Sequence, residues 1–210
     1  MNTRQPRNRL YDGRFYARTI DRMLARMRTI VAGHVEPCRR LLDVGCGTGA
    51  LALLLAERAD EVLGVELSPK MVDFANRQRT ERGLTHLSFV LGDVTRVCAD
   101  LPTEHFDLAT MVLTLHEMPS DARTPVLAEV GRLARQVLCV DFCAPMPFNR
   151  AGIRNRAMEI AAGVEHYRAF RDFTRRGGVA GLAAAAGLEY RHLRTIDART
   201  VELCLLARPA

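Results

Sequence analysis

Short apolar runs, each about as long as a β-strand, alternate along this chain with longer stretches that have helical periodicity. Because strands that alternate with helices are joined by crossover connections, this order predicts a parallel sheet with helices on both faces. The runs that we expect to be strands are 41–44, 62–66, 87–91, 106–112 and 137–142. The stretches that we expect to be helices between them are 51–58, 71–82 and 126–135. The fold class is therefore α/β.

The C-terminal part departs from this alternation. Residues 188–196 and 201–207 are two strand-like runs separated by only four residues, a spacing typical of a hairpin. We therefore expect the parallel sheet to end in an antiparallel pair. Helical segments are also expected at 14–33, before the first strand, and at 150–176, before two consecutive glycines. These two segments are the candidates for a lid.

The size of the chain fits one domain. With 210 residues, 48% of them hydrophobic, it is large enough for one core and too small for two full domains. The longest apolar stretches, at 51–56 and 182–188, are too short to cross a bilayer, and the arginine-rich start lacks the apolar block of a secretory signal. We expect a cytoplasmic protein with an N-terminal helical cap (1–38), a main domain (39–210) and a helical lid segment at about 145–177 within it.

Positive charge is concentrated at the start of the chain. Residues 1–40 hold ten arginines against three acidic residues, while the whole chain has a formal net charge of +6. Such an arm is compatible with nucleic acid, an anionic membrane surface or an acidic substrate. However, Lys70 is the only lysine, an arginine bias that genomic base composition also produces. We therefore do not expect nucleic acid as a partner.

The cysteines do not indicate a metal centre. They are scattered along the chain with no CxxC pair, which fits neither a zinc site nor a dense set of disulfides. Reduced and mostly buried thiols are the simplest interpretation, so no metal is expected from Cys38, Cys46, Cys98, Cys139, Cys143 and Cys204.

A glycine-rich turn follows the first predicted strand. Residues 41–50 read LLDVGCGTGA, which places Gly45, Gly47 and Gly49 between a strand and a helix. Glycines there let the backbone approach a ligand at the carboxyl edge of the sheet, where α/β proteins bind ligands. Glu66 ends the next strand, and a carboxylate at that place accepts hydrogen bonds from ribose hydroxyls. The ligand is therefore expected to contain a nucleoside.

The same glycines also satisfy the GxGxx(G/A) pattern of dinucleotide sites, with Ala50 as the last residue. Asp43 argues against that ligand, because a carboxylate before the turn is unfavourable for a pyrophosphate and favourable for a cationic amino acid tail. Asp93 follows the third strand, where its carboxylate is suited to the exocyclic amine of adenine. A nucleoside with a cationic tail is thus favoured over a dinucleotide.

Together, DVGCGTG at 43–49, Glu66, GDV at 92–94 and FDLATMVLTLHEMP at 106–119 resemble the class I S-adenosylmethionine-dependent methyltransferases. The resemblance extends from about Arg39 to the end of the chain, with the motifs in the family's order. It implies a Rossmann-like, doubly wound seven-stranded sheet of order 3-2-1-4-5-7-6 with strand 7 antiparallel. The pattern is most similar to the small-molecule branch that includes the ubiquinone and menaquinone methyltransferases. LHEMP after the fourth strand departs from those quinone enzymes.

The resemblance also implies roles for individual residues around S-adenosylmethionine. Asp43 and the loop of Gly45, Cys46, Gly47 and Gly49 would hold the methionine part, and Glu66 the ribose. Leu67 and Met71 would flank the adenine. Asp93, followed by Val94, would bind its N6, and the backbone near Leu113 the amino group.

Two further groups are candidates for the acceptor side. Methyl transfer needs a base only where the acceptor must lose a proton, and His116 with Glu117 lies just past the fourth strand, on the edge that faces the methyl group in this fold. A structural role for both, at the end of the strand, is the alternative. Tyr167, Phe170 and Phe173 recur every three residues and share one face of a helix, which is most simply a core face. The alternative is that Tyr167 and His166 form part of an acceptor pocket. Tyr11 and Tyr16 of the arm are further candidates for substrate contacts.

The sequence thus predicts S-adenosylmethionine-dependent methyl transfer to oxygen or carbon of a small, aromatic, quinone-like or lipid-like acceptor. Two alternatives stay open. One is an RNA or protein methyltransferase that uses the basic arm, and the other is a donor-binding scaffold without catalysis. The identity of the acceptor and the oligomeric state are not predicted.

Overall fold

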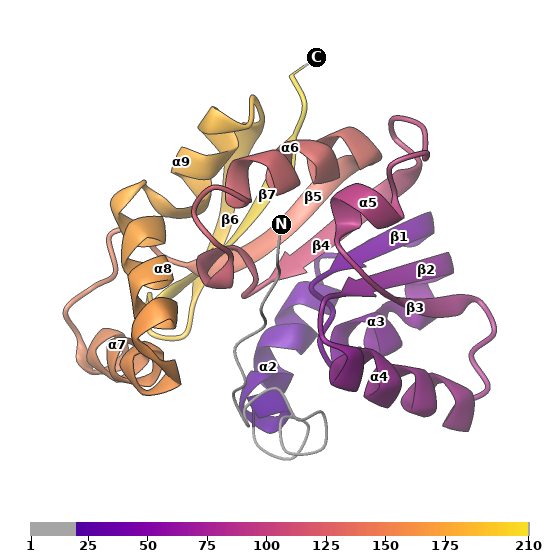
Figure 1. Ribbon diagram of the computed structural model, residues 1–210, viewed down its shortest axis with the longest axis horizontal. Helices are drawn as coiled ribbons and strands as arrows, with labels where there is room; N and C mark the ends of the chain where they lie inside the picture. The colour runs from indigo at the N-terminus through magenta and orange to yellow at the C-terminus, as the bar shows by residue number, and fades with distance from the viewer. Residues whose placement is uncertain (1–19, 210) are drawn as a thin grey trace.

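The computed structural model describes residues 20–209, which form a seven-stranded sheet with helices on both faces (Figure 1). The strand order is β3-β2-β1-β4-β5-β7-β6, and β7 pairs antiparallel with both of its neighbours. This confirms the predicted topology and hairpin. The strands are β1 (Cys38–Val44), β2 (Ala59–Glu66), β3 (Leu87–Leu91), β4 (Phe106–Val112), β5 (Ala134–Phe142), β6 (Glu189–Ile196) and β7 (Val201–Ala207).

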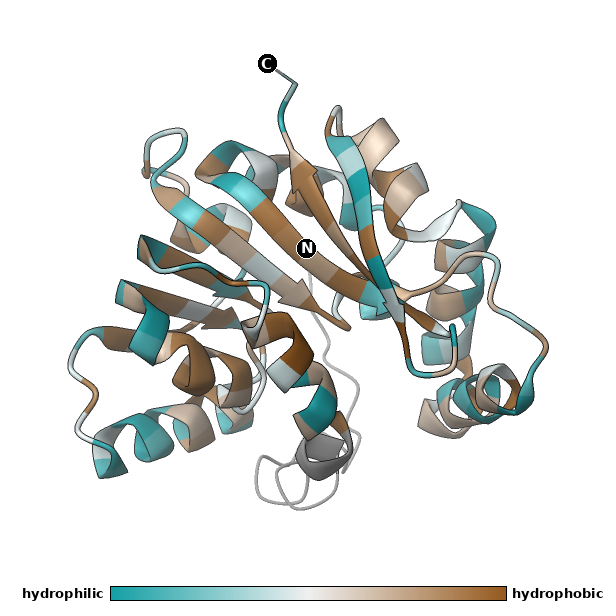
Figure 2. Cartoon of the chain, turned by 180° about the vertical axis from the view of Figure 1, so that it is seen from behind, coloured by the Kyte–Doolittle hydropathy of each residue, from teal (hydrophilic) through white to brown (hydrophobic). Residues whose placement is uncertain are grey.

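The central strands are buried on both faces, which explains their uninterrupted apolar sequences. The last four residues of β1 and the last six of β5 are all buried, whereas the edge strand β6 is mostly exposed. Figure 2 shows this pattern, with hydrophobic colour on the central strands and hydrophilic colour on the outer helix surfaces. The core therefore lies on both sides of β1, β4 and β5.

The helices that cover the sheet form two layers. On one face lie α2 (Ile20–Ala32), α3 (Ala50–Leu55) and α4 (Pro69–Glu81), and on the other α5 (Val94–Val97), α6 (Arg123–Leu133) and α9 (Gly178–Ala185) (Figure 1). The 3-10 turn η2 (Ala56–Arg58) completes α3. Contacts of α4 with β3, and of α6 and α9 with β5, hold these layers on the sheet.

Beyond the carboxyl ends of the strands lie α7 (Arg150–Ala162) and α8 (Val164–Arg175). The predicted helical segment at 150–176 is thus two helices, because Gly163 between them adopts φ 131°, outside the helical range. Helix α8 packs against the 3-10 turn η3 (Leu115–Glu117), which directly follows β4. The break at Gly163 brings two helices, rather than one, to the carboxyl edge of the sheet.

Some predicted boundaries were wrong. Residues 134 and 135, expected at the end of a helix, begin β5 instead, because α6 ends at Leu133 and the chain is already extended at Ala134. The prediction did not include α5 or α9 as helices. Within the described residues, 20–209, no helix is long and apolar enough to cross a membrane.

The turn after β1 generates a prediction about stability. Gly49 has φ +76°, and a Cβ built there would lie 2.4 Å from the Cζ atom of Phe89. We expect Gly49→Ala to lower the free energy of unfolding by about 3 kcal/mol, since left-handed strain and overlap with a core ring add. Gly83→Ala is the control. Its φ is +66°, but a Cβ there would have no atom within 4 Å, so we expect the free energy of unfolding to fall by only about 1 kcal/mol. Urea denaturation measures both, and equal losses would contradict the steric explanation.

Candidate functional site

A cleft of about 2280 Å³ runs along the carboxyl edge of the sheet. Its walls come from the ends of β1, β2, β3 and β4, from α2, and from α7 and α8. It is larger than the pockets of about 300–1,000 Å³ that hold a single small ligand. The cleft therefore has room for two ligands side by side.

The glycine turn forms one wall of the cleft. Gly45, Gly47 and Gly49 all have left-handed φ values, of 68°, 55° and 76°. Gly45 donates its N–H to the Val65 carbonyl at 2.8 Å, which ties the turn to β2. Gly47 lines the cleft, and a Cβ there would have no atom within 4 Å. The turn thus presents bare backbone to the cleft at Gly47.

Glu66 lies at the end of β2 and lines the cleft beside this turn. Its Oε2 accepts a hydrogen bond from the Gly47 N–H at 3.1 Å, and its Oε1 accepts one from the Ser68 N–H at 2.8 Å. Burial raises the pKa of this carboxyl, although the backbone hydrogen bonds oppose the rise. The carboxylate is therefore held in one orientation at the floor of the cleft.

Asp43 lies at the end of β1, buried beneath the glycine turn and outside the cleft lining. Thr110 on β4 donates its hydroxyl to Asp43 Oδ1 at 2.7 Å, while Oδ2 is buried and has no hydrogen-bond partner among the described residues. Burial raises the pKa of Asp43 to about 7, and the charge of Glu66 adds to the rise. Cys46 is buried close by, and burial raises the pKa of its thiol well above the usual range, so it is unsuited as a nucleophile.

Most of the other residues expected near the donor also line the cleft. Leu67 is half exposed, while Met71 and Val94 are buried. Asp93 Oδ1 accepts the N–H of Thr95 at 2.9 Å and its hydroxyl at 2.8 Å, so this carboxylate also caps α5. Leu113 has φ 53° and donates its N–H to the Val140 carbonyl at 2.7 Å, which leaves that N–H engaged.

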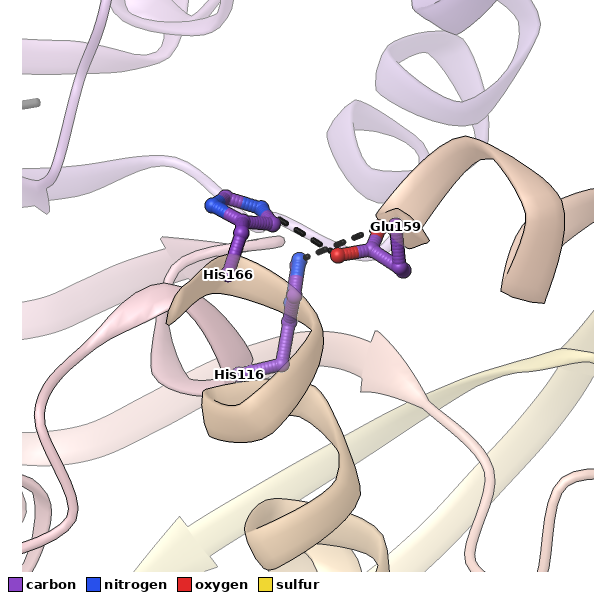
Figure 3. A group of neighbouring side chains, drawn as sticks. All are labelled: His116, Glu159 and His166. Atoms are coloured by element: carbon purple, nitrogen blue, oxygen red, sulfur yellow. Dashed lines mark ion pairs between the residues drawn. The ribbon is translucent and has the colours of Figure 1, made fainter. Parts of the chain in front are cut away.

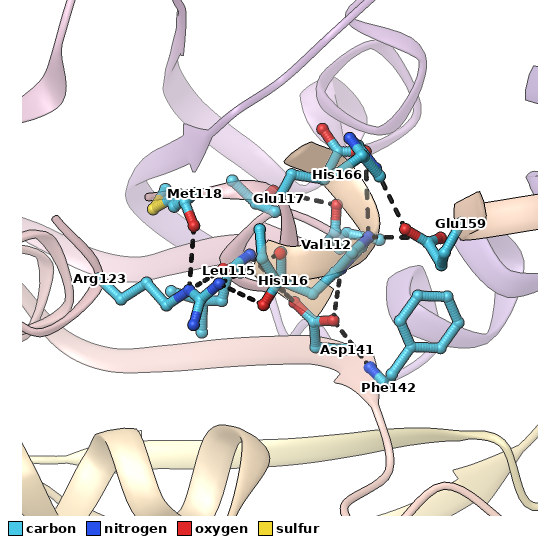
Figure 4. Close-up of polar contacts among 12 residues, drawn as sticks. Val112, Leu115, His116, Glu117, Met118, Arg123, Asp141, Phe142, Glu159 and His166 are labelled. Atoms are coloured by element: carbon cyan, nitrogen blue, oxygen red, sulfur yellow. Dashed lines mark hydrogen bonds and ion pairs between the residues drawn. The ribbon is translucent and has the colours of Figure 1, made fainter. Parts of the chain in front are cut away.

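At the other end of the cleft, the buried His116 in η3 is hydrogen-bonded to Asp141 (Figure 4). Its Nδ1 lies 2.7 Å from Asp141 Oδ1, and the backbone N–H groups of Leu115 and His116 donate to Asp141 Oδ2 at 3.0 and 3.3 Å. The Phe142 N–H donates to Oδ1 at 2.7 Å. This arrangement fixes the imidazole and directs its Nε2 into the cleft.

Three ionisable side chains surround that Nε2 atom (Figure 4). Glu117 Oε1 and Glu159 Oε1 each lie 3.9 Å from it, and His166 Nε2 lies 3.2 Å from Glu159 Oε2. Burial alone lowers the pKa of His116, but the nearby carboxylates, above all Asp141, raise it to about 9. The hydrogen bond to Glu159 likewise raises the pKa of His166. The sequence placed His116, Glu117 and His166 as candidates, and the structure brings them together.

The Arg123 side chain connects this end of the cleft to helix α8. It is fully buried, and its Nε donates to the carbonyls of Leu115 and Met118 at 2.9 and 3.1 Å. Its guanidinium also donates to the Ala169 carbonyl at 2.6 Å and to Asp172 Oδ2 at 2.9 Å, both in α8. The turn η3 and helix α8 are thereby held as one unit.

The remaining candidates lie elsewhere. Phe170 and Phe173 are buried in the core, and Tyr167 stacks on Phe170 outside the cleft lining, so this face of α8 packs as core. Tyr11 and Tyr16 lie outside the described residues.

Known proteins resemble this chain in sequence and in fold. A family model described as "Methyltransferase domain" matches residues 41–147, about half of the chain. The chain belongs to this methyltransferase family. The match includes the glycine turn, Glu66, Asp93, His116 and Asp141. The strand order and the glycine turn agree with the class I fold, whose methyl donor is S-adenosylmethionine.

Two curated relatives of this methyltransferase act on different acceptors. A "23S rRNA (uracil(1939)-C(5))-methyltransferase RlmD" of Alkalilimnicola ehrlichii is 33% identical over 118 residues, which cover 55% of this chain and 25% of that protein. A "Geranyl diphosphate 2-C-methyltransferase" of Saccharopolyspora erythraea is 51% identical over 53 residues, 25% of this chain and 19% of that protein. The chain spans less than half the length of the first curated relatives it matches.

A solved structure shares the fold. The structure of an O-methyltransferase family protein from Burkholderia thailandensis superimposes with a TM-score of 0.71 at 16% identity, and the match covers 93% of this chain and 59% of that one.

The methyltransferase cleft fits the donor at its glycine-turn end. Gly47 leaves open space where a side chain would otherwise stand, which suits close approach of a ligand to the backbone. Just beneath, Asp43 keeps a buried oxygen that has no hydrogen-bond partner among the described residues. The carboxylates of Asp43 and Glu66 match a ligand that carries a sulfonium and an ammonium group.

Sequence reasoning missed Asp141, Glu159 and Arg123. One signal was available for Asp141, since a single acid in the otherwise apolar run 137–142 indicates a buried and partnered carboxylate. Glu159 and Arg123 lie on helices among many charged residues, and their spacing in the sequence carries no such signal.

The buried carboxyl of Asp43 predicts a pH dependence of stability. Its folded pKa of about 7 lies above the usual value of 3.8 because burial outweighs the hydrogen bond from the Thr110 hydroxyl, and Glu66 adds repulsion. The unfolded chain therefore loses this proton first as the pH rises. Asp43 thus contributes stability that is fully present below about pH 4 and lost progressively up to about pH 7.

Urea denaturation between pH 4 and 8 tests this, with Asp43→Asn as the comparison. The wild type should lose stability relative to the variant from about pH 4 to 7, and the difference should then level off. A difference that is constant over this range would show that Asp43 is ionised in the fold.

Proposed function

We propose that this chain transfers the methyl group of S-adenosylmethionine to an oxygen or carbon atom of a small-molecule acceptor. The observation that carries the proposal is the continuity of the cleft, which joins the glycine turn and Glu66 to the His116 cluster. Its volume of about 2280 Å³ exceeds what one ligand of ordinary size needs, so donor and acceptor can lie in it together.

We assign the donor to the glycine-turn end. Glu66 would accept hydrogen bonds from the ribose hydroxyls, and the turn at Gly45–Gly49, with Asp43 beneath, would hold the methionine part near the backbone of Leu113. Leu67, Met71 and Val94 would flank the adenine, beside Asp93. When bound, the donor supplies an electrophilic methyl whose C–S bond breaks as the acceptor's lone pair forms the new bond, which leaves a neutral thioether.

We assign the acceptor to the other end of the cleft. Nδ1 of His116 is occupied by Asp141, so Nε2 is the atom that can exchange a proton with the acceptor. Because the carboxylates raise the pKa of His116 to about 9, this atom takes the proton in the fraction of molecules whose imidazole is neutral, and that fraction grows as the pH rises toward 9. Glu117 and His166 border the same space, and Phe142, Met158 and Val164 provide apolar lining. An acceptor with an aromatic, quinone-like or lipid-like body and one ionisable group matches this combination.

RNA is the second candidate acceptor. It is favoured by the similarity to the RlmD protein of Alkalilimnicola ehrlichii, whose name gives 23S rRNA as substrate, although the match covers only a quarter of that protein. Transfer of labelled methyl to total RNA, compared with transfer to a set of phenols, quinones and isoprenoid compounds, separates the two. Incorporation into RNA alone would overturn the small-molecule proposal.

Binding of S-adenosylhomocysteine, the thioether that remains after methyl transfer, tests the assignment of the donor to the glycine-turn end. Glu66→Gln keeps the shape of the side chain but removes the charge, so we expect it to weaken S-adenosylhomocysteine binding about 10-fold or more. Glu61→Gln on the same strand is the control, because Glu61 is exposed and lies outside the cleft lining. Calorimetric titration gives both values, with NAD as a negative ligand. Equal binding by the two variants would remove Glu66 from the donor site.

Measurement of turnover tests the assignment of the acceptor to the His116 end. With an accepted small molecule, His116→Gln should lower kcat by about 100-fold or more while S-adenosylhomocysteine binding stays unchanged. His86→Gln is the matched control, since that imidazole bonds to the Ala56 carbonyl away from the cleft. If His116→Gln keeps the wild-type kcat, His116 is not involved in the chemistry. If the wild type binds the donor product and methylates no acceptor, the chain is a donor-binding scaffold.

A further inference from the structure

Three side chains from three separate elements converge at the acceptor end of the cleft (Figure 3). They are His116 in η3, Glu159 in α7 and His166 in α8, and each offers one ligand atom. These atoms all lie within 4.8 Å of one another. Two imidazoles and a carboxylate are a set that occurs in catalytic zinc sites and in the facial triad of non-haem iron.

The individual distances are close to those around a bound ion. His166 Nε2 lies 3.2 Å from Glu159 Oε2, and His116 Nε2 lies 3.9 Å from Glu159 Oε1. Ligands about 2.0–2.2 Å from a tetrahedral metal lie roughly 3.3 Å apart. Movements of about one ångström, within the reach of side-chain rotation, would therefore bring the three atoms onto one ion.

Glu159 provides a second and independent observation. The residue is only 8% exposed, and its two oxygens point to different imidazoles: Oε2 lies 3.2 Å from His166 Nε2, and Oε1 lies 3.9 Å from His116 Nε2. A buried carboxylate is costly unless a positive group compensates it. The space between the carboxylate and the two imidazoles is where a cation would lie (Figure 3).

The surroundings of His116 match those of a metal ligand. Metal-bound histidines usually donate their second ring N–H to a carboxylate, which fixes the tautomer and the ring orientation. Asp141 occupies this position, with its Oδ1 2.7 Å from His116 Nδ1. A metal ion would displace the proton from Nε2, whose lone pair then faces Glu159 and the cleft while Nδ1 keeps its proton.

We propose that His116, Glu159 and His166 bind a divalent first-row transition metal ion of the zinc or manganese type. Glu117 lies at the rim as a further oxygen donor, with its Oε1 3.6 Å from His166 Nε2. Two nitrogen ligands disfavour magnesium and calcium, which prefer oxygen ligands alone. Because the cluster lines the cleft, the open coordination position would face the acceptor.

Metal binding itself does not depend on the proposed function, but a role for the metal at the acceptor does. There, the cation would attract an acceptor oxygen and favour its ionised form. His116 would then position the ion rather than take the proton. The expectation of no metal came from the scattered cysteines, whereas this site uses none of them.

Titration of tag-free, chelator-treated protein with Zn²⁺ and with Mn²⁺ tests the inference, without donor or acceptor present. We expect one ion per chain with micromolar or tighter affinity for at least one of the two, together with a raised Tm. Mg²⁺ should bind at least about 10-fold more weakly than the better of these ions. Absence of micromolar binding by either ion, or equal binding of Mg²⁺, would overturn the proposal and assign the cluster to proton binding alone.

Variants locate the site. His166→Gln and Glu159→Gln should each weaken metal binding about 10-fold or more and reduce the rise in Tm. His192→Gln is the matched control, because His192 faces Glu202 at 3.7 Å and lies outside the cluster, so its metal binding should equal that of the wild type. Wild-type affinity in both cluster variants would contradict the assignment. S-adenosylhomocysteine binding by the same variants shows that they are folded and tests the donor site separately.

Discussion

The acceptor end of the cleft depends on one buried carboxylate, that of Asp141 at the end of β5. Four donors converge on it: the N–H groups of Leu115, His116 and Phe142, and Nδ1 of His116. Without that acceptor, the backbone of η3 would leave two buried N–H groups unpaired, which is strongly unfavourable. The position of η3, and with it the direction of the His116 ring, thus follows from an acid placed at the end of a central strand.

Arg123 extends this constraint to helix α8. Its guanidinium joins the carbonyls of η3 to the Ala169 carbonyl and Asp172 of α8, although the group is fully buried and desolvation lowers its pKa. The carbonyl and carboxylate acceptors around it make that burial tolerable. Because His166 lies in the same helix, three residues before Ala169, Arg123 also determines how close His166 comes to His116. Helix α8 is therefore positioned by polar contacts as well as by the packing of Phe170 and Phe173.

The residues that line the glycine-turn end of the cleft could be predicted from the sequence, and those at the His116 end only in part. The glycine turn and Glu66 follow strand ends, and parallel strands bring their carboxyl ends to one edge, so local signals sufficed. His116 was found in the same way, after the fourth strand. Glu159 becomes a neighbour of His116 only through the break at Gly163 and the docking of α8. That docking depends on Arg123, and neither spacing nor periodicity reveals such a long-range contact.

Both halves of the cleft share an electrostatic feature that constrains what they bind. Asp43 and Glu66 lie at one end, and Asp141 with Glu159 at the other, all largely buried. Burial penalises the charged carboxylate, which is why the pKa values of Asp43 and Glu66 are raised. A cationic ligand reverses that penalty, because it supplies the missing opposite charge in a medium of low dielectric constant. The proposed sulfonium donor would satisfy this requirement at the glycine turn. Protons on His116 and His166, or a metal ion between them, satisfy it at the other end.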